Sequence, residues 1–258
     1  MTKNAPAKVN IFLKITGTRE NYHTLASRFV RVDSLYDILT FVPKSENKEG
    51  LELIGDFSCH NKNNTITKAF NALCEMGYKK SLDELASQYA LHVIKQIPEG
   101  AGLGGGSSDA ATFLHMCNEV ANLGCTIKEL AKIGESIGAD VPFFVYGFSG
   151  ANVTGVGEII EPFEENLPTL ELVTPPLTCN TKAVYEHFRA NRLGCIDLDL
   201  ANQMLQLDSH TLLTQYEAVS LNDLMPSALS LYPQLAAYIE PGWCMSGSGS
   251  TLFRIRNG

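Results

Sequence analysis

One segment of the sequence has residue types that suit the binding of a phosphate group. Five glycines occur within residues 100–106, and two serines follow them. Glycine lets the backbone approach a ligand closely, although it costs conformational entropy on folding. The segment lies between a predicted strand and a predicted helix, and the first amides of a helix are free to hold an anion. We therefore predict a phosphate-binding loop rather than a flexible connector.

The loop residues are Pro98, Glu99, Gly100, Ala101, Gly102, Leu103, Gly104, Gly105, Gly106, Ser107 and Ser108. The loop lacks the lysine of a Walker A motif, but Gly100, Gly102 and Gly105 satisfy the dinucleotide pattern G-x-G-x-x-G. That pattern belongs to a βαβ unit with an acidic residue after the second strand. Here the acid at about the right distance is Glu119, which lies inside the predicted helix. A nucleotide-binding oxidoreductase therefore stays only as an alternative.

Other residues could supply acid–base or binding chemistry. Lys8 and Asn10 share one face of a predicted strand, because apolar and other residues alternate through residues 7–16. Asp140 follows a predicted helix, in the run Gly-Ala-Asp-Val-Pro. Each of these residues alone is more often structural than catalytic. The Gly-Ser run at 247–250 is not the G-x-S-x-G elbow, so an α/β-hydrolase has no support.

Periodicity and turn residues predict the elements that carry these groups. The first half has predicted strands at 7–16, 29–32, 38–42, 51–54 and 89–97, a polar turn at 45–50, and helices at 64–77 and 109–122. Thr126 and Glu129 form a capping-box pattern that opens a further helix, which ends at Gly138. The second half has predicted strands at 153–160, 171–174 and 252–255 and helices at 181–191, 202–207, 208–219 and 227–238.

Composition excludes several classes of protein. The 258 residues carry a formal net charge of −8, which argues against nucleic acid or an anionic membrane as a partner. Seven cysteines without a C-x-x-C pair predict reduced, buried thiols in a cytoplasmic protein. No apolar run reaches the ~18–20 residues that a membrane span needs. The start of the sequence lacks the apolar core of a signal peptide.

Taken together, three motifs resemble those of the GHMP kinase superfamily. They are the run at residues 5–10, the glycine loop, and the Gly-Ser turn at 245–250. The resemblance implies an α+β fold of two lobes, at residues 1–154 and 155–258, with ATP as the phosphoryl donor and Mg²⁺ expected with it. The N-terminal lobe would resemble ribosomal protein S5 domain 2, and the C-terminal lobe would be ferredoxin-like.

Within the superfamily, the motifs are most similar to the branch that phosphorylates the 2-hydroxyl of a cytidine diphosphate-linked methylerythritol, in the non-mevalonate isoprenoid pathway. Further matches lie at 22–25, 138–144 and 222–224. This resemblance implies that Lys8 and Asp140 are the catalytic pair. The substrate-binding residues that it implies are Asn10, Tyr22, His23, Thr181 and Tyr185.

The sequence departs from this pattern in two places. The turn before Tyr22 is usually Asp-Gly and here is Glu20-Asn21. Asn can adopt the left-handed conformation, so we expect the turn to form. The segment around Thr181 lacks the usual prolines. A homoserine or mevalonate kinase and a non-catalytic nucleotide-binding module are the remaining alternatives. We expect a monomer or weak homodimer.

Overall fold

The computed structural model describes residues 1–44 and 50–256, and the chain forms two compact units. Unit 1 comprises residues 1–7, 32–97 and 104–148, and unit 2 comprises residues 8–31, 98–103 and 149–258. The units are discontinuous because the two long N-terminal strands and the glycine loop each contribute to both of them. The predicted lobes, at residues 1–154 and 155–258, instead divide the chain at one position. This division into lobes stays a prediction.

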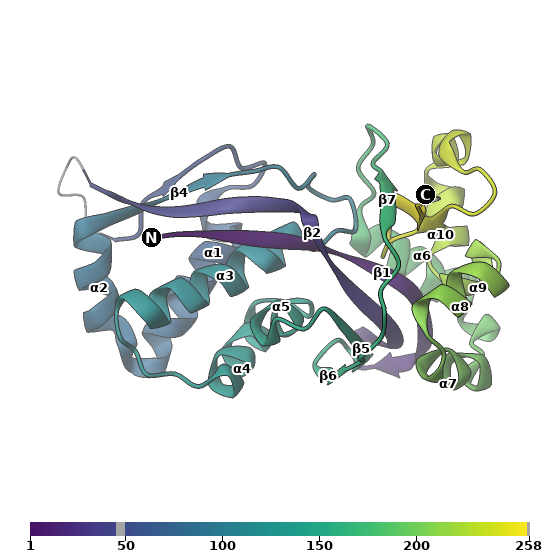
Figure 1. Ribbon diagram of the computed structural model, residues 1–258, viewed down its shortest axis with the longest axis horizontal. Coiled ribbons are helices and arrows are strands. Elements are labelled where there is room, and N and C mark those ends of the chain that lie inside the picture. The colour runs from purple at the N-terminus through teal and green to yellow at the C-terminus, as the bar shows by residue number, and fades with distance from the viewer. Residues whose placement is uncertain (45–49, 257–258) are drawn as a thin grey trace. The chain divides into compact units, whose positions relative to one another are not determined.

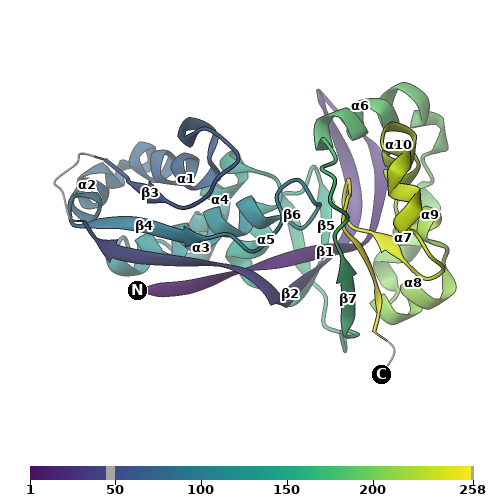
Figure 2. The ribbon, with the colours of Figure 1, turned by 90° about the horizontal axis from the view of Figure 1, so that it is seen from above.

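In unit 1, helices pack on one side of part of a six-stranded sheet (Figure 1, Figure 2). Residues 38–43 of β2 pair antiparallel with β4, and β3 pairs parallel with β4. This part of the sheet contains three of its six strands: β2 (Tyr22–Pro43), β3 (Leu53–Ile54) and β4 (Tyr89–Ile94). The helices are α1 (Thr65–Leu73), α2 (Lys79–Gln88), α3 (Gly105–Val120), α4 (Ile127–Ile137) and α5 (Val141–Tyr146).

Local sequence signals explain where the helices of unit 1 begin and end. The predicted capping box is confirmed: the Thr126 backbone N–H donates to the Glu129 carboxylate at 2.7 Å, and the Glu129 N–H donates to Thr126 Oγ1 at 3.3 Å. The helix that was predicted at residues 64–77 is shorter in the structure. It ends as α1 at Leu73 and continues as a π-helical turn, Cys74–Tyr78, in which Gly77 has a φ of 99°. Helices α2 and α5 were not predicted from the sequence.

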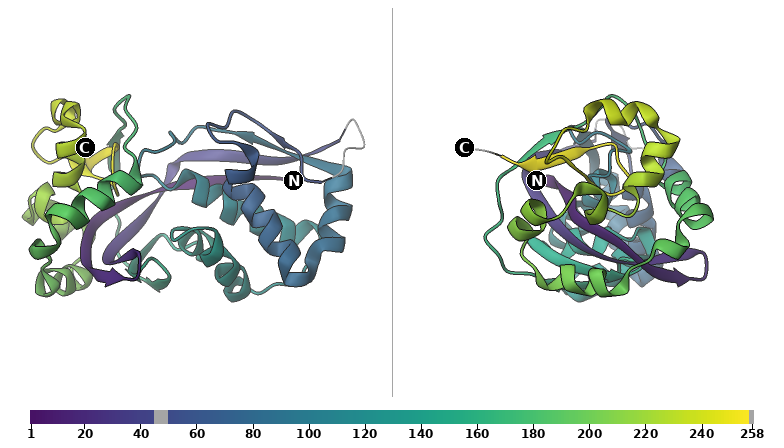
Figure 3. Two further views of the ribbon diagram at one scale, coloured as in Figure 1. Left: turned by 180° about the vertical axis from the view of Figure 1, so that it is seen from behind. Right: turned by 90° about the vertical axis from the view of Figure 1, so that its right-hand side faces the viewer.

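Unit 2 contains the hairpin turn of β1 (Thr2–Arg19) and β2, drawn in purple in Figure 3. Residues 25–30 of β2 pair antiparallel with β5 (Gly150–Gly155), which pairs with β6 (Ile159–Pro162). The turn between β1 and β2 forms, as expected, but Glu20 rather than Asn21 has the left-handed conformation, with a φ of 55°.

A second sheet in unit 2 has the order β7-β9-β8. Its strands are β7 (Leu170–Val173), β8 (Cys244–Met245) and β9 (Leu252–Ile255), and the helices of the unit are α6 (Thr181–Asn191), α7 (Leu198–Gln206), α8 (Ser209–Gln215), α9 (Ala218–Leu221) and α10 (Met225–Leu231). Leu13 and Ile15 of β1 are buried in one apolar cluster with Phe188, Leu224 and Trp243. This core fixes the strand that carries Lys8 and Asn10 to α6 and α10.

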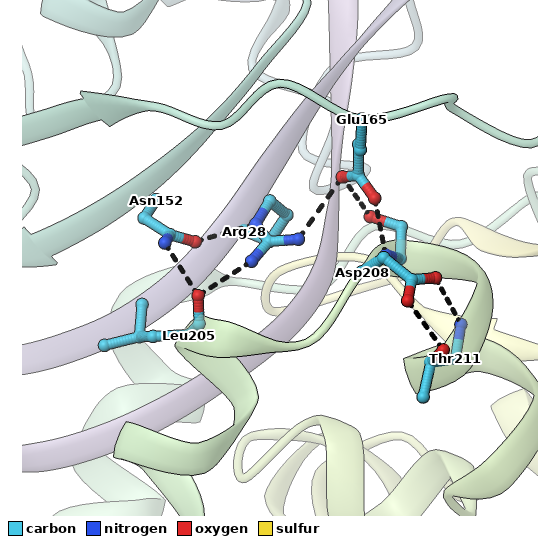
Figure 4. Close-up of polar contacts among 7 residues, drawn as sticks. Arg28, Asn152, Glu165, Leu205, Asp208 and Thr211 are labelled. Atoms are coloured by element: carbon cyan, nitrogen blue, oxygen red, sulfur yellow. Dashed lines mark hydrogen bonds and ion pairs between the residues drawn. The ribbon is translucent and has the colours of Figure 1, made fainter.

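A buried arginine joins several elements of unit 2 (Figure 4). Arg28 is fully buried, and its guanidinium donates to Asn152 Oδ1 at 2.7 Å and to the Leu205 carbonyl at 3.1 Å. It forms an ion pair with Glu165 at 3.2 Å and lies 3.4 Å from the centre of the Phe163 ring. These contacts connect β2 and β5 to the C-terminal end of α7.

Several other predictions need correction. The alternation through residues 7–16 is typical of a strand with one buried face, but every residue from Ala7 to Ile15 is buried, because the strand runs inside the fold. The predicted strand at 153–160 is two strands, since Gly155 has a φ of 71° at the turn between them. The predicted helix at 208–219 is α8 and α9. The predicted polar turn at 45–50 falls mainly outside the described residues.

All seven cysteines are free thiols, as predicted. Cys59 and Cys195 are exposed and Cys74 is half-buried, so the expectation that every thiol is buried is wrong for these three. Among the residues that the structure describes, no helix has the length and apolar character to cross a membrane.

Candidate functional site

Three segments that are far apart in the sequence meet at the first half of the glycine loop, within unit 2. The Lys8 backbone N–H donates to the Leu103 carbonyl at 2.9 Å. The Ser246 hydroxyl donates to the Gly102 carbonyl at 2.9 Å, and the Thr251 N–H donates to the Ala101 carbonyl at 3.1 Å. The N-terminal strand and the late Gly-Ser turn therefore hold the loop backbone from two sides.

The structure explains why two positions in this half of the loop are occupied by glycine. Gly102 has a φ of 76°, and a Cβ atom there would lie 2.3 Å from the Ser246 carbonyl oxygen. Gly100 has a φ of 65°, and its Cβ would lie 2.4 Å from Thr178 Cγ2. Any L side chain would meet both a strained backbone and a steric clash. The close approach of the loop to the late turn thus requires glycine at position 102.

The second half of the loop, in unit 1, forms the start of α3. The helix begins four residues before the predicted 109, and its first residue follows Gly104, which has a φ of 70° and offers no side-chain cap. The amides of this first turn are therefore available to an anion. Ser108 is fully buried, and its hydroxyl has no hydrogen-bond partner within the described residues. A buried hydroxyl without a partner at a helix start fits a phosphate oxygen or a phosphate-bound cation.

A buried cluster of charges supports this helix start. Lys95 donates to Asp109 Oδ2 at 2.6 Å and also pairs with Asp37, whose carboxylate accepts the Ile97 N–H at 2.8 Å. Burial raises the pKa of Asp109 to about 7, although the charge of Lys95 opposes this shift. The cluster connects the end of β4 to the first turn of α3, and so it holds the two ends of the glycine loop that lie in unit 1.

Lys8 and Asn10 form a buried polar pair within unit 2. Only 4% of Lys8 and 2% of Asn10 is exposed. The Lys8 ammonium donates to Asn10 Oδ1 at 2.6 Å and lies 4.4 Å from the centre of the Phe29 ring. The Asn10 side-chain amide donates to Ser27 Oγ at 3.0 Å. These contacts orient both predicted side chains. Lys8 is therefore not an ordinary exposed lysine of a strand.

Asp140 lies in unit 1, directly before α5, and is half-buried. Its carboxylate does not cap that helix. A Cβ atom on Gly138 would lie 3.8 Å from Ser107 Oγ, so the segment that carries Asp140 runs beside the start of α3. Each of the two predicted catalytic residues therefore lies on a segment that borders the glycine loop in its own unit.

The resemblance implies an aromatic pocket for the cytosine, with Tyr22 and Tyr185 as its walls and His23 beside them, and the structure brings part of this set together. The His23 ring centre lies 5.3 Å from that of Tyr185 and 6.0 Å from that of Phe188. His23 is buried, its Nε2 atom has no partner within the part of the chain that the structure describes, and burial and Arg189 lower its pKa. Tyr22, in contrast, is 68% exposed. The structure brings His23 and Tyr185 together and leaves the Tyr22 ring accessible to solvent.

Thr181, the first residue of α6, joins the late Gly-Ser turn. Its hydroxyl lies 2.9 Å from Ser248 Oγ. The helix starts here because the preceding Asn180 side chain accepts the Ala183 N–H at 2.9 Å. The departure from the usual prolines thus leaves a regular helix start at this position.

Two serines that were not predicted from the sequence contact the predicted site. Ser27 accepts from the Asn10 side chain, and Ser246 accepts from the Asn10 N–H at 3.2 Å. The Gly-Ser composition of the late turn was a visible signal for Ser246. Ser27 carried no signal, because its role depends on how β1 and β2 align.

Comparison with known proteins agrees with the geometry. Residues 64–148 match the model of the GHMP kinases N terminal domain. A solved structure, the crystal structure of 4-(cytidine 5'-diphospho)-2C-methyl-D-erythritol kinase, has a TM-score of 0.76 and 31% identity and covers 100% of this chain and 91% of its own. The mevalonate kinase of Methanococcus jannaschii shares the fold alone, with a TM-score of 0.63 at 12% identity. The fold and the glycine loop define a kinase of the GHMP class.

The full-length relatives define the family more closely. A 4-diphosphocytidyl-2-C-methyl-D-erythritol kinase of Sulfurimonas denitrificans is 50% identical over 98% of this chain and 96% of its own. One of Campylobacter jejuni is 42% identical over 97% of this chain and 98% of its own. The chain belongs to the 4-diphosphocytidyl-2-C-methyl-D-erythritol kinase family. The predicted family and the predicted α+β fold are thereby confirmed.

Proposed function

We propose that this protein transfers the terminal phosphoryl group of ATP to the 2-hydroxyl of 4-diphosphocytidyl-2-C-methyl-D-erythritol. The proposal is supported by full-length relatives of that name at 42–50% identity. The observation that carries it in the structure is the convergence of Lys8, Asn10 and the late turn on the glycine loop. The Lys8 backbone N–H and the Ser246 hydroxyl donate to carbonyls of the loop, so the strand that carries the Lys8 ammonium and the Asn10 amide is fixed to the proposed phosphate-binding loop.

Residues 98–108 would bind the phosphates of ATP. Phosphoryl transfer asks the protein mainly for positioning and charge stabilisation. The uncapped first turn of α3 supplies fixed dipoles for this purpose. Mg²⁺, when bound with ATP, would neutralise charge on the phosphate oxygens. Ser108 is the hydroxyl in this turn that would face the phosphates or the ion. The described residues contain no group of three or more acidic, His or Cys side chains that could hold a metal alone.

Lys8 and Asp140 are the catalytic residues of the proposal. Asp140 would accept or orient the proton of the acceptor hydroxyl, so that the oxygen is aligned for attack. Lys8 would neutralise charge near that oxygen and on the moving phosphoryl group. Asn10, which already accepts from Lys8, would bind the polyol of the acceptor.

The cytosine would bind at the aromatic pocket. Tyr185 supplies a face for stacking, and Tyr22 would close over the base from its exposed position. The lowered pKa of His23 keeps its imidazole neutral near pH 7, so that Nε2 can hydrogen-bond the edge of the base. Thr181 would complete this side of the substrate site.

The test is an acceptor panel with ADP release as the readout. The panel contains 4-diphosphocytidyl-2-C-methyl-D-erythritol, free 2-C-methyl-D-erythritol, mevalonate and homoserine. We expect efficient turnover of the first compound and only background release with the others, because they lack the cytidine that the aromatic pocket binds. Preferred turnover of mevalonate or homoserine would assign the protein to another branch of the superfamily. Bound NAD in place of ATP would support an oxidoreductase instead.

We propose that the enzyme works as a monomer or weak homodimer in the cytoplasm, without nucleic acid or membrane partners. The seven free thiols and the net charge of −8 support this environment. Sedimentation at micromolar concentration tests the oligomeric state, and a tight oligomer would contradict it.

A further inference from the structure

The pair Asn222-Asp223 lies between α9 and α10 and has no role in the proposed function. Asn222 is extended, with a φ of −133°, and only 2% of it is exposed. It forms an isolated parallel bridge with Leu13 of β1. A buried asparagine is costly unless its amide is hydrogen-bonded, so its partners indicate what it does.

Asp223 fixes β1 at its middle. The Asp223 N–H donates to the Leu13 carbonyl at 2.9 Å, and its carboxylate accepts the Ile15 N–H at 2.8 Å. The Lys14 ammonium pairs with the same carboxylate and donates to the Ser220 carbonyl at 3.1 Å. The pair therefore aligns like a short strand beside β1, a few residues after Lys8 and Asn10.

Asn222 fixes the late turn. Its side-chain amide donates to the Met245 carbonyl at 2.7 Å and to the Gly247 carbonyl at 2.9 Å. Its Oδ1 atom accepts the Leu224 N–H at 2.9 Å. Both amide hydrogens and the carbonyl oxygen are thus used, and the two carbonyls that Asn222 binds flank Ser246.

Ser246 in turn contacts the site directly. Its hydroxyl donates to the Gly102 carbonyl and accepts the Asn10 N–H, at 2.9 and 3.2 Å. A Cβ atom on Gly247 would lie 3.4 Å from Asn10 Oδ1 and 3.5 Å from Gly102 Cα. If this turn moved, the backbone of the glycine loop at Gly102 would move with it. The residues of the turn that contact Asn10, Ser246 and Gly247, would also be displaced.

We propose that Asn222 is a positioning residue for phosphoryl transfer: it sets the late turn against the glycine loop and aligns that turn with the strand carrying Lys8 and Asn10. Asp223 holds the segment that contains Asn222 against β1. Together the two residues therefore fix the position of the glycine loop relative to β1. The kinetic consequence rests on the proposed function, whereas the structural consequence does not.

The experiment compares Asn222→Ala, Asn222→Asp and the milder Asn222→Ser with the control Asn118→Ala. Asn118 also makes two hydrogen bonds to backbone, with Cys125 at 2.9 Å each, but it lies near the far end of α3 in unit 1. Asn222→Asp keeps the size and the Oδ1 acceptor and places an oxygen against two carbonyl oxygens. Amide hydrogen exchange at residues 98–103 and 245–251 and steady-state kinetics are measured on each variant.

We expect exchange at residues 98–103 to accelerate about tenfold or more in Asn222→Ala and Asn222→Asp, less in Asn222→Ser, and not in the control. We expect kcat to fall about 10–100-fold and the KM for ATP to rise, because small displacements of positioning groups cost rate. A role in folding alone would lower the active fraction, and with it the apparent kcat, while leaving both KM values unchanged.

Unchanged exchange at residues 98–103 in the folded Asn222 variants would overturn the proposal, as would kinetics that match those of Asn118→Ala. If Asn222→Ala does not fold, Asn222→Ser retains one donor and gives the same two readouts. If the wild-type protein does not phosphorylate the cytidine diphosphate-linked acceptor, the proposed function fails, but the exchange comparison still decides the role of Asn222.

Discussion

At the scale of single residues, the proposed phosphoryl transfer depends on Lys8 and Asp140. We predict that Lys8→Met and Asp140→Asn each lower kcat by about 10²–10³-fold, which is the usual loss when a positioned charge or donor is removed. Steady-state ADP release measures the loss, and circular dichroism verifies the fold. Asp56→Asn, at an exposed carboxylate in unit 1, is the matched control and should retain full activity. A folded Asp140→Asn protein with wild-type turnover would remove Asp140 from the mechanism.

Asp109 gives a prediction for stability against pH. Burial raises its pKa from an ordinary value of 3.8 to about 7 in the folded protein. Between these pH values the folded state holds a proton that the unfolded state has released, so the free energy of unfolding falls as pH rises from about 4 to 7. Asp109→Asn removes this contribution, and its stability should decline less over the same range.

Urea unfolding at about pH 5 and pH 8 measures the effect. The loss in the free energy of unfolding between these pH values should be larger in the wild-type protein than in Asp109→Asn, by about 1 kcal/mol or more. The control Asp56→Asn should follow the wild-type protein at both values. Parallel changes in wild type and Asp109→Asn would show that the Asp37–Lys95–Asp109 cluster keeps Asp109 ionised throughout this range.

At the scale of elements, Arg28 is the side chain that connects β2, β5 and the end of α7 (Figure 4). We predict that Arg28→Met destabilises the protein by about 3–5 kcal/mol, because Glu165 is left as a buried charge without its ion-pair partner. Adding Glu165→Gln should recover part of this loss, since the remaining side chain is neutral. Denaturant unfolding tests both variants, and a cost below about 1 kcal/mol for Arg28→Met would contradict the interpretation.

Short-range signals predicted elements well where one segment determines its own structure. Helix α6 and strand β9 have the predicted bounds, and the α4 capping box forms as expected. The signals failed where a glycine changed the path of the chain, at Gly77 and Gly155. They also failed for α2 and α5, whose apolar pattern is brief and whose helical state depends on packing in unit 1.

At the scale of the whole molecule, the candidate site was predictable only in part. The glycine spacing predicted a phosphate loop, and the resemblance supplied Lys8, Asn10 and Asp140. The burial of Lys8 was not predictable, because an isolated lysine on a strand is normally exposed. The contacts of Ser246 and Asn222 join residues more than 200 positions away in the sequence to β1, and no local pattern encodes such a contact.

The position of the transferred phosphate tests the central claim most directly. The 2-carbon of 2-C-methyl-D-erythritol carries a methyl group and no hydrogen, so a phosphate on its oxygen has no proton three bonds from phosphorus. We predict that the purified product shows a new phosphomonoester signal that remains a singlet in the proton-coupled phosphorus NMR spectrum. A signal split into a doublet or triplet would place the phosphate on another hydroxyl, and the absence of a phosphomonoester with this acceptor would contradict the proposed kinase activity.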